Sequence, residues 1–313
     1  MAINLATKKI LVTGGAGFLG SHLVEKLIAH GVSQSDITVP DSRVCDLRVK
    51  ENCVRAVENQ DIVIHLAAKA GGIGLNRAKP GELFYDNIVM GAYLMESART
   101  AGVSKFVAIA TICAYPKFTP VPFREEYLWE GYPEETNAPY GLAKKMLLVQ
   151  AQAYRKQYGM NIITLFPVNM YGSRDNFNPD SSHVLPALIQ KISEAKKKSQ
   201  PFIEVWGSGT PTREFLYVED AAEWIVLATE QYDKADPVNL APGMEISIKD
   251  LVTLVCRFMD YTGEIRWDFS KPDGQPRRML DISRAVREIG LIPITPFEEG
   301  LRKTIEWYNK NNG

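Results

Sequence analysis

The amino-acid sequence predicts an α/β fold in which a doubly wound, mostly parallel sheet is joined to a smaller α+β domain. Two observations lead to this expectation. Over the first half of the 313-residue chain, short apolar runs alternate with amphipathic helical stretches, which is typical of repeated βαβ units. After Phe166 the pattern changes to a polar, loop-rich stretch, and a second series of helices and strands follows it.

Each strand expected in the first half is a short run rich in apolar residues. The five runs are Lys9–Thr13, Asp36–Val39, Asp61–Leu66, Lys105–Ala110 and Asn161–Phe166. Between them, apolar residues recur three and four positions apart, a spacing that places them on one face of a helix. These helical stretches are Ser21–Ala29, Val49–Glu58, Asn87–Ala101 and Tyr140–Tyr158.

The second half begins with the polar loop PVNMYGSRDNFNPDSSH, and such loops often receive the substrate in enzymes built on a doubly wound sheet. The patterns beyond it predict alternating helices and strands. In order, these are a helix Val184–Lys198, a strand Phe202–Trp206, an extended run Arg213–Val218, a helix from about Asp220, a last sheet strand Val238–Leu240, a helix Ile248–Met259, a strand Glu264–Asp268 and a C-terminal helix ending at Tyr308.

The composition excludes several classes of protein. Hydrophobic residues make up 45% and charged residues 23%, as in an ordinary globular protein. The formal net charge of -1 gives no general attraction to nucleic acid or membranes, and no apolar run approaches the ~20 residues that span a bilayer. The start MAINLATKK lacks the apolar stretch of a secretion signal, and there is no CxxC pair. We therefore expect a cytoplasmic protein with free thiols and no metal site.

A glycine-rich turn lies between the first strand and the first helix, with Gly14, Gly17 and Gly20 in the segment ILVTGGAGFLG. Glycines there permit a tight turn, close approach of a pyrophosphate and close packing of helix on sheet. Phe18 and Leu19 stand just ahead of the expected helix Ser21–Ala29, whose N-terminus offers unpaired N–H groups and the positive end of its dipole. The sequence thus predicts a Rossmann-type dinucleotide-binding domain. We assign it residues 1–168 and 212–240, and a substrate-binding domain residues 169–211 and 241–313.

The loop after the second strand leaves the choice between NADP and NAD open. Asp41 would accept a hydrogen bond from a ribose hydroxyl and repel a 2′-phosphate, as NAD requires, whereas Ser42 and Arg43 could bind that phosphate. Asp46 stands where it could hydrogen-bond the adenine amino group. Its alternative role is to cap a helix ahead of Arg48.

The segment HLAAK closes the third strand with residues that have short or uncharged side chains. Leu66, Ala67 and Ala68 would let the backbone approach the diphosphate and ribose of a dinucleotide. The alternative is that these residues only permit tight packing of the core, and both can hold together.

Tyr140 and Lys144 are four residues apart on an expected helix, so their side chains share one face. An ammonium beside a phenol favours the phenolate and lowers the phenol pKa from about 10, which would make Tyr140 a usable acid or base near neutral pH. Thr111 ends the strand Lys105–Ala110, where its hydroxyl could polarise a substrate carbonyl. Together with the glycine turn, this set resembles the short-chain dehydrogenases/reductases of the extended type.

Longer stretches are similar to those of the GDP-L-fucose synthase family, the GDP-4-keto-6-deoxymannose 3,5-epimerase/4-reductases. With the glycine turn they extend from Gly14 to Asp281, and they are HLAAKAGGIGLN, ICAYPK, TNAPYGLAK, PVNMYGSRDNFNPDSSHVLPALI, VWGSGTPTREFLYVED and SKPDGQPRRMLD. The resemblance implies a GDP-sugar substrate, NADP (NADPH) as the cofactor, and conversion of GDP-4-keto-6-deoxy-D-mannose to GDP-L-fucose. It also implies a homodimer that pairs through helices including the one that carries Tyr140.

The resemblance assigns proton transfers at C3 and C5 of a 4-keto sugar to Cys113 and His183. The residue types fit, because both carbons lie next to the C4 carbonyl and lose protons readily once Thr111 and Tyr140 stabilise the enolate oxygen. A thiol and an imidazole both titrate near enough to neutrality to give and take protons. Tyr140 would then protonate the oxygen as a hydride reaches C4, and Lys144 would also bind the nicotinamide ribose.

The same resemblance implies further contacts with cofactor and substrate. The remaining cofactor-binding residues would be Asn87, Pro167, Val168, Met170 and His183, and the substrate-binding residues Asn169, Lys191, Trp206, Arg213 and Lys271. A guanidinium can grip a phosphate with two hydrogen bonds, which suits Arg213 to the diphosphate. The alternative for Arg213 is a surface salt bridge with Glu214 or Glu219.

The sequence departs from the family pattern at three positions. Thr111 stands where serine is usual, Ile112 follows where a small polar residue is common, and Asp41 replaces the basic residue expected for NADPH. Two other functions remain as alternatives. One is a related GDP-sugar epimerase or reductase, for example of the GDP-heptose type, that retains bound NAD without net reduction. The other is a non-catalytic dinucleotide sensor, against which Cys113 and His183 speak.

Overall fold

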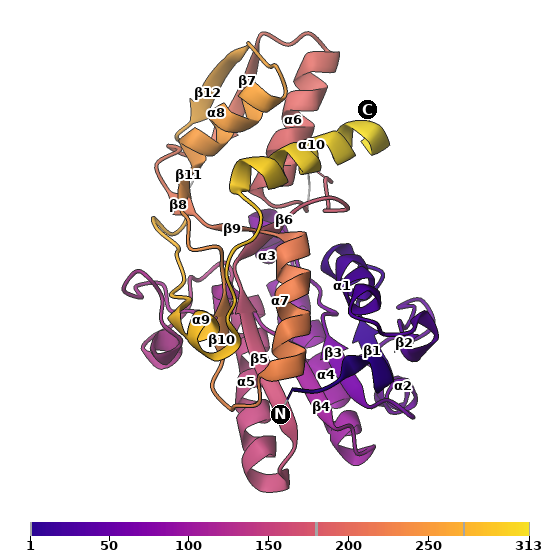
Figure 1. The fold of residues 1–313 in the computed structure, drawn as a ribbon. Helices are drawn as coiled ribbons and strands as arrows, with labels where there is room; N and C mark the ends of the chain where they lie inside the picture. Colours follow the sequence, from indigo (N-terminus) through magenta and orange to yellow (C-terminus); the bar gives the residue numbers. More distant parts are fainter. Residues whose placement is uncertain (1, 179–180, 272, 313) are drawn as a thin grey trace.

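The computed structural model describes residues 2–178, 181–271 and 273–312, so residues 179 and 180 of the predicted polar loop lie outside the described residues. Its centre is a six-stranded sheet of order β10-β5-β4-β3-β1-β2, in which every neighbouring pair is parallel (Figure 1). The strands are β1 (Ile10–Thr13), β2 (Ile37–Thr38), β3 (Ile62–His65), β4 (Lys105–Ile109), β5 (Asn161–Pro167) and β10 (Val238–Leu240). The strand order reverses between β1 and β3, which confirms the doubly wound sheet.

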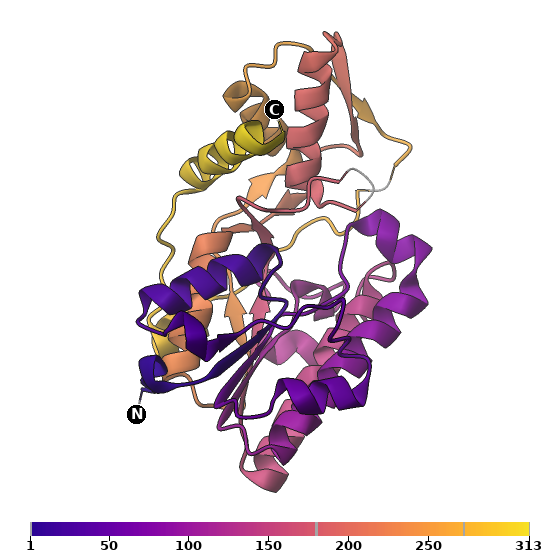
Figure 2. The ribbon, with the colours of Figure 1, turned by 90° about the vertical axis from the view of Figure 1, so that its right-hand side faces the viewer.

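Helices cover both faces of the sheet, because alternate residues of each buried strand point to opposite sides. Ile10 and Val12 of β1 pack into one core, and Leu11 between them packs into another. The first core is covered by α1 (Phe18–Ala29), α7 (Val218–Gln231) and α9 (Ser283–Ile289), and the second by α2 (Lys50–Ala56), α4 (Pro80–Thr100) and α5 (Ala138–Tyr158). Figure 2 shows these two layers on either side of the strands.

The predicted helices exist, but several begin earlier than their apolar pattern indicates. Helix α1 begins at Phe18 rather than Ser21, and α4 begins at Pro80 rather than Asn87. A proline is well tolerated in the first turn of a helix, since its missing N–H has no partner there in any case. The first turn of α4 is exposed at residues 80–82 and shows no apolar pattern, whereas that of α1, residues 18–20, is mostly buried and belongs to the glycine-rich segment that the sequence predicts as a turn. No helix in the described ranges has the length and apolar character needed to cross a membrane.

A smaller domain with its own core lies above the sheet in Figure 1. It contains α6 (Val184–Lys197), α8 (Ile248–Phe258) and α10 (Phe297–Asn312) and the parallel pair of β7 (Phe202–Trp206) and β12 (Glu264–Asp268). The core includes Leu188, Val252 and Leu301, one from each helix. The predicted strands 202–206 and 264–268 are confirmed, and helices α6 and α8 end within one residue of their predicted limits.

Two short pairs of strands connect the domains. These are the parallel pair β6 (Asn169–Tyr171) with β9 (Phe215–Tyr217) and the antiparallel pair β8 (Thr212–Arg213) with β11 (Ile246–Ser247). The chain then returns to the large core, where Ala285, Ile289 and Leu291 pack beside α7 and β10. The sequence assigns residues 241–313 to the smaller domain. The side chains of this segment just named, however, cover the edge strand β10 of the large sheet. The functional division into two domains stays a proposal.

Glu214 is a buried carboxyl at this junction, with only 1% of its surface exposed. Its Oε2 accepts a hydrogen bond from the Leu280 N–H at 2.6 Å, and the Gly243 N–H bonds to the same carboxyl group. Burial raises the pKa of Glu214 to about 8. The carboxyl is therefore mostly protonated at neutral pH, which avoids the cost of a buried charge.

We expect Glu214 to make the folded protein less stable as the pH rises from about 4.5 to about 8. In this window the unfolded chain loses the proton near its ordinary pKa of 4.5 while the folded chain keeps it, so ionisation favours unfolding. Glu214→Gln retains an uncharged acceptor but no longer titrates. The free energy of unfolding of each protein is measured in urea at about pH 5 and about pH 8. Between these two pH values, the wild type should lose stability relative to Glu214→Gln. An equal difference at both pH values would contradict a protonated Glu214.

Candidate active site

The glycine turn leaves the first turn of helix α1 open to an anion. Gly14 has φ +74°, in the left-handed region, and a Cβ there would lie 2.9 Å from the amide nitrogen of Ala67. A Cβ on Gly20 would run into the carbonyl oxygen of Gly14, so α1 packs directly on the turn. Gly17 is the N-cap, no described side chain caps the helix, and its first turn, which holds Phe18, Leu19 and Gly20, has no acidic residue. This cradle fits the pyrophosphate of a dinucleotide.

Two contacts hold the segment 66–69 after strand β3. The Ala67 N–H donates to Thr13 Oγ1 at 3.3 Å. Asn87 in α4 accepts from the Lys69 N–H at 3.1 Å and donates to the Lys69 carbonyl at 2.8 Å. Asn87, which the resemblance assigns to the cofactor, therefore uses its amide to fix the main chain of this segment.

Asp41 and Arg43, which favour different cofactors, are paired with each other. The Arg43 guanidinium donates to both Asp41 oxygens, with 2.6 Å between Nη2 and Oδ2, and Asp41 also accepts the Arg43 N–H. Hydrogen bonding to Arg43 holds the pKa of Asp41 below its usual range. The Arg43 side chain is 87% exposed, so the pair is worth little and opens easily. Ser42 between them is also exposed.

Asp46 does not cap helix α2, so that alternative is wrong. The N-cap is Val49, because residues 47–49 form a turn before the helix begins at Lys50. Asp46 instead accepts the Arg48 N–H at 2.9 Å and forms an ion pair of 2.7 Å with the Arg48 guanidinium. The adenine contact of Asp46 stays a prediction.

Thr111, Tyr140 and Lys144 come together where helix α5 meets the end of strand β4. Thr111 follows β4, and its Oγ1 accepts from the Cys113 N–H at 3.2 Å. The Tyr140 phenol is hydrogen-bonded to the Thr111 side chain. Lys144, one helical turn further on, is only 2% exposed. A Cβ on Gly141 would collide with the Cys113 carbonyl, so α5 rests directly on the turn that holds these groups.

Burial controls the protonation states of this cluster. The sequence predicts that Lys144 lowers the pKa of Tyr140, but this prediction is wrong for the protein by itself. Burial raises the pKa of Tyr140 above its usual value, and nearby Cys113 acts in the same direction, because removing water penalises the phenolate. Burial also lowers the pKa of Lys144 to about 8. Burial, and then the charge of Lys144, lower the pKa of His65 to about 3. At neutral pH the cluster therefore holds a protonated phenol on Tyr140, an ammonium on Lys144 and a neutral imidazole on His65.

Arg278, which the sequence does not single out, faces Cys113. Its Nη1 lies 3.9 Å from the Cys113 Sγ. Arg278 Nε donates to Gln275 Oε1 at 2.8 Å, and Gln275 Nε2 donates to the Lys117 carbonyl at 2.7 Å, which fixes the guanidinium. The neighbouring Arg277 forms an ion pair elsewhere. Two consecutive arginines look alike in a sequence, and only the direction of the backbone decides which one enters the site.

Arg213 lies beside Arg278 and is partly buried. Burial, and then the charge of Arg278, lower the pKa of Arg213 to about 10. Arg213 Nη1 donates to the Thr212 carbonyl at 2.7 Å. Arg213 forms no salt bridge with Glu214 or Glu219 among the described residues, and these carboxyl groups accept hydrogen bonds from the Leu280 N–H and the Tyr217 hydroxyl instead. Two adjacent guanidiniums favour an anionic ligand.

His183 and Lys191 belong to the smaller domain. His183 is the N-cap of α6 and keeps exposed surface, yet protein atoms surround the ring closely enough that burial lowers its pKa. The Gly72 N–H donates to the Ser181 carbonyl at 3.0 Å, so the loop that carries His183 touches the loop after β3. Lys191, about two turns along the helix, donates to the Glu204 carbonyl at 2.6 Å.

The remaining predicted site residues lie in two separate places. Trp206 ends β7 with 56% of its surface exposed, and the Lys271 Nζ lies over its ring at 5.5 Å from the centroid. The other four residues lie where β5 ends and β6 begins, with Pro167 and Val168 buried and Asn169 and Met170 partly exposed.

The fold and this site define a class of protein, the dinucleotide-binding enzymes with a hydroxyl, tyrosine and lysine cluster beside a glycine turn. Residues 10–241 match the model of the NAD dependent epimerase/dehydratase family. The chain is 41% identical over 306 residues to a GDP-L-fucose synthase of Sinorhizobium fredii, which covers 97% of this chain and 96% of that protein. The chain therefore belongs to the NAD dependent epimerase/dehydratase family and, within it, to the family of the GDP-L-fucose synthases.

Solved structures share this fold over the whole chain. A GDP-6-OMe-4-keto-L-xylo-heptose reductase from C. jejuni has a TM-score of 0.92 at 25% identity and covers 100% of both chains. A GDP-L-fucose synthetase from Naegleria fowleri bound to NADP has a TM-score of 0.88 at 28% identity, covering 98% of this chain and 95% of that one. The likeness includes both domains, which confirms the predicted fold class.

We expect Gly141→Ala to destabilise the protein by about 1–3 kcal/mol, because the added methyl group would push helix α5 away from the Cys113 carbonyl. The matched control is Gly81→Ala in the first turn of α4, where the added Cβ meets open space and alanine favours the helix. Thermal unfolding should show a lower melting temperature for the first variant only. Equal melting temperatures for the two variants would refute the close contact at residue 141.

Proposed function

We propose that this chain is an NADP-dependent GDP-sugar 3,5-epimerase/4-reductase that converts GDP-4-keto-6-deoxy-D-mannose to GDP-L-fucose. The position of Cys113 carries the proposal, since its thiol lies in the turn directly after Thr111 and beside the Tyr140 phenol. A ketone reductase needs only the hydroxyl, the phenol and the ammonium. A thiol in the same cluster adds a group that can move a proton at carbon, which the epimerase reaction requires. The similarity to a GDP-L-fucose synthase supports this assignment.

The two epimerisations are proton transfers at carbons next to the C4 ketone. Loss of a proton from C3 or C5 leaves negative charge on the C4 oxygen, and hydrogen bonds from Thr111 and Tyr140 would stabilise that charge. Cys113 and His183 are the groups to which we assign the transfers. At each carbon a proton leaves one face of the ring and a proton returns to the opposite face, so no electrons are gained or lost. Burial lowers the pKa of His183, so its neutral form is available as a proton acceptor.

The reduction then uses the same polar groups. When bound, the reduced nicotinamide supplies the hydride for C4. Tyr140 donates the proton to the C4 oxygen, a role for which its raised pKa keeps it protonated. Lys144 is an ammonium below its pKa of about 8, and in that form it would hold the nicotinamide ribose and favour the phenolate left on Tyr140. One hydride and one proton convert the ketone to the alcohol.

The substrate would be held mainly through its nucleotide. Arg213 and Arg278 are suited to the diphosphate, because both guanidiniums lie beside Cys113 without an ion pair among the described residues. The exposed ring of Trp206, with Lys271 above it, offers a flat face for the guanine. The sequence-based assignments of Asn169 and Lys191 to the substrate remain part of this proposal.

The cofactor would lie across the glycine turn, with its pyrophosphate at the first turn of α1. Pro167, Val168 and Met170 would then line the nicotinamide. Binding of NADP requires Arg43 to turn from Asp41 to the 2′-phosphate, which the exposure of this pair permits. The NADP bound to the Naegleria fowleri protein supports this choice. The same Asp41 carboxylate favours the alternative of retained NAD, with no net reduction.

Domain roles and assembly follow from the same proposal. Residues 1–168 and 212–240 would bind the dinucleotide, and residues 169–211 and 241–313 the GDP-sugar. We also propose a homodimer that pairs through α4 and α5. Exposed Tyr85 and Tyr93 on α4 and Val149 on α5 support it, since large apolar side chains gain from burial between subunits. The free thiols agree with a cytoplasmic enzyme.

A paired assay with NADPH and NADH tests the proposal. With GDP-4-keto-6-deoxy-D-mannose, we expect one NADPH to be oxidised for each GDP-L-fucose formed, and a slower reaction with NADH because the Arg43 contact to the 2′-phosphate is missing. Absorbance of the cofactor gives the stoichiometry, and mass spectrometry with NMR identifies the product. Product formation without oxidation of either cofactor would favour the retained-NAD alternative. A reaction only with a GDP-heptose would move the substrate to that class.

Cys113→Ser should impair epimerisation much more than reduction, because serine keeps the size but is a far weaker acid and base at carbon. We expect exchange of the C3 and C5 protons with D₂O to slow by about 100-fold or more. Cys45→Ser is the matched control, since this partly buried thiol lies in the loop after β2. NMR of the sugar protons measures the exchange. Equal exchange in both variants would remove Cys113 from the reaction.

A further inference from the structure

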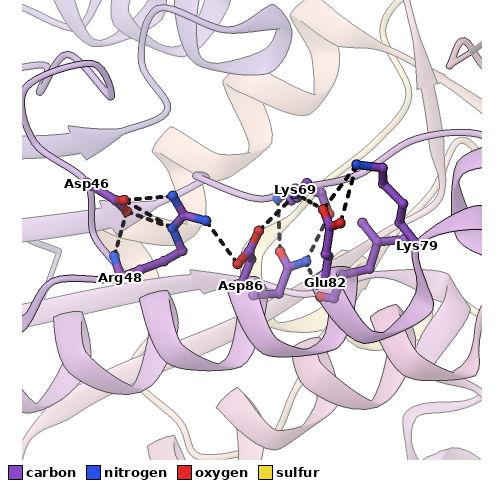
Figure 3. Close-up of polar contacts among 8 residues, drawn as sticks. Asp46, Arg48, Lys69, Lys79, Glu82 and Asp86 are labelled. Atoms are coloured by element: carbon purple, nitrogen blue, oxygen red, sulfur yellow. Dashed lines mark hydrogen bonds and ion pairs between the residues drawn. The ribbon is translucent and has the colours of Figure 1, made fainter.

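A network of charged side chains joins the loops that follow β2 and β3, with Asp86 of helix α4 at its centre (Figure 3). Arg48 Nη1 lies 3.2 Å from Asp86 Oδ1, and Lys69 Nζ lies 3.1 Å from Asp86 Oδ2. Arg48 belongs to the segment after β2, and Lys69 to the segment after β3. One carboxylate therefore bridges two loops that are more than twenty residues apart in the sequence.

Asp86 is the buried member of this network. Its side chain is 8% exposed, whereas those of Asp46 and Glu82, the other carboxylates, are 38% and 50% exposed. Each cation also has one of these outer partners, with Arg48 2.7 Å from Asp46 and Lys69 2.7 Å from Glu82. Water and salt screen the outer pairs, so the contacts to Asp86 contribute the larger share of the coupling between the loops.

We propose that Asp86 is a positioning residue for the adenosine half of the cofactor. The inference rests on the proposed binding of NADP. In a doubly wound sheet a dinucleotide lies outside the carboxyl ends of the strands, at the point where the strand order reverses. The loop after β3, with the segment 66–69, borders that point between β1 and β3, and the loop after β2, which carries Arg43 and Asp46, lies one strand further along the same edge, beyond β1. Asp86 fixes the distance between them without touching the cofactor.

Each loop keeps its own anchor when the charge of Asp86 is removed. Arg48 stays paired with Asp46, and the main chain of Lys69 stays bonded to the Asn87 amide. The two cations remain in contact with water, because their side chains are 46% and 36% exposed. Loss of the bridge therefore loosens one loop against the other and leaves both loops folded. Binding of adenosine should suffer, and the chemistry at Tyr140 should not.

The test is Asp86→Asn in the full-length protein, with dissociation constants measured by calorimetry for NADPH and for adenosine 2′,5′-bisphosphate. We expect both constants to rise about tenfold, while kcat at saturating NADPH stays within about twofold of the wild type. The matched control, Glu82→Gln, removes the exposed partner of the same Lys69 and should change either constant by less than about twofold. Arg48→Gln breaks the bridge from its other end and should raise both dissociation constants as Asp86→Asn does. If Asp86→Asn does not fold, Arg48→Gln provides the test.

Unchanged dissociation constants in the bridge-breaking variants would overturn the inference, as would a fall in kcat with unchanged affinity. A wild type that binds NADH in place of NADPH would refute the choice of NADP. The role of Asp86 is then decided with NADH and adenosine 5′-monophosphate as the probes, since the bridge lies beside the adenosine in either cofactor. A wild type that binds no dinucleotide would overturn both the proposed function and this inference.

Discussion

Helix α5 approaches the turn after strand β4 so closely that residue 141 can have no side chain, since a Cβ would collide with the Cys113 carbonyl. This contact brings groups from two distant parts of the sequence into one site. Thr111 lies at the strand end, Cys113 in the turn, and Tyr140 one residue before the contact. A displaced α5 would separate the phenol from both the hydroxyl and the thiol. The proposed proton transfers and the proposed reduction therefore depend on the same packing.

Desolvation gives the site its chemical character. The phenol of Tyr140 and the ammonium of Lys144 share one helix face, yet burial moves both pKa values toward the neutral form of each group. The protein by itself thus holds a proton on Tyr140. Arg213 and Arg278 also lie near Cys113, and their two like charges remain close together. An anionic substrate would relieve the repulsion between these two guanidiniums. Substrate binding would therefore reduce the net positive charge near the Cys113 thiol.

The core of the sheet was predictable because its strands are buried on both faces and its helices on one. Buried strands such as β3 and β4 appear as continuous apolar runs, and helices such as α5 and α8 show apolar residues at helical spacing. The first turn of α4 escaped prediction because its residues are exposed and carry no such pattern, and that of α1 because its residues belong to the glycine-rich turn. The return of α9 to the large core was also not predictable, since short helices can cover either domain.

The sequence by itself determined the dinucleotide-binding fold and the local groups whose geometry follows from spacing. Gly14 and Gly20 meet across one turn, and Tyr140 and Lys144 meet on one helix face. The tertiary structure alone decided which distant residues join them. It selected Arg278 over Arg277, and it placed Asp86 between two loops. It also reversed the expected direction of the Tyr140 pKa, because burial depends on every segment that surrounds a group, whereas helical spacing describes only its neighbours in the chain.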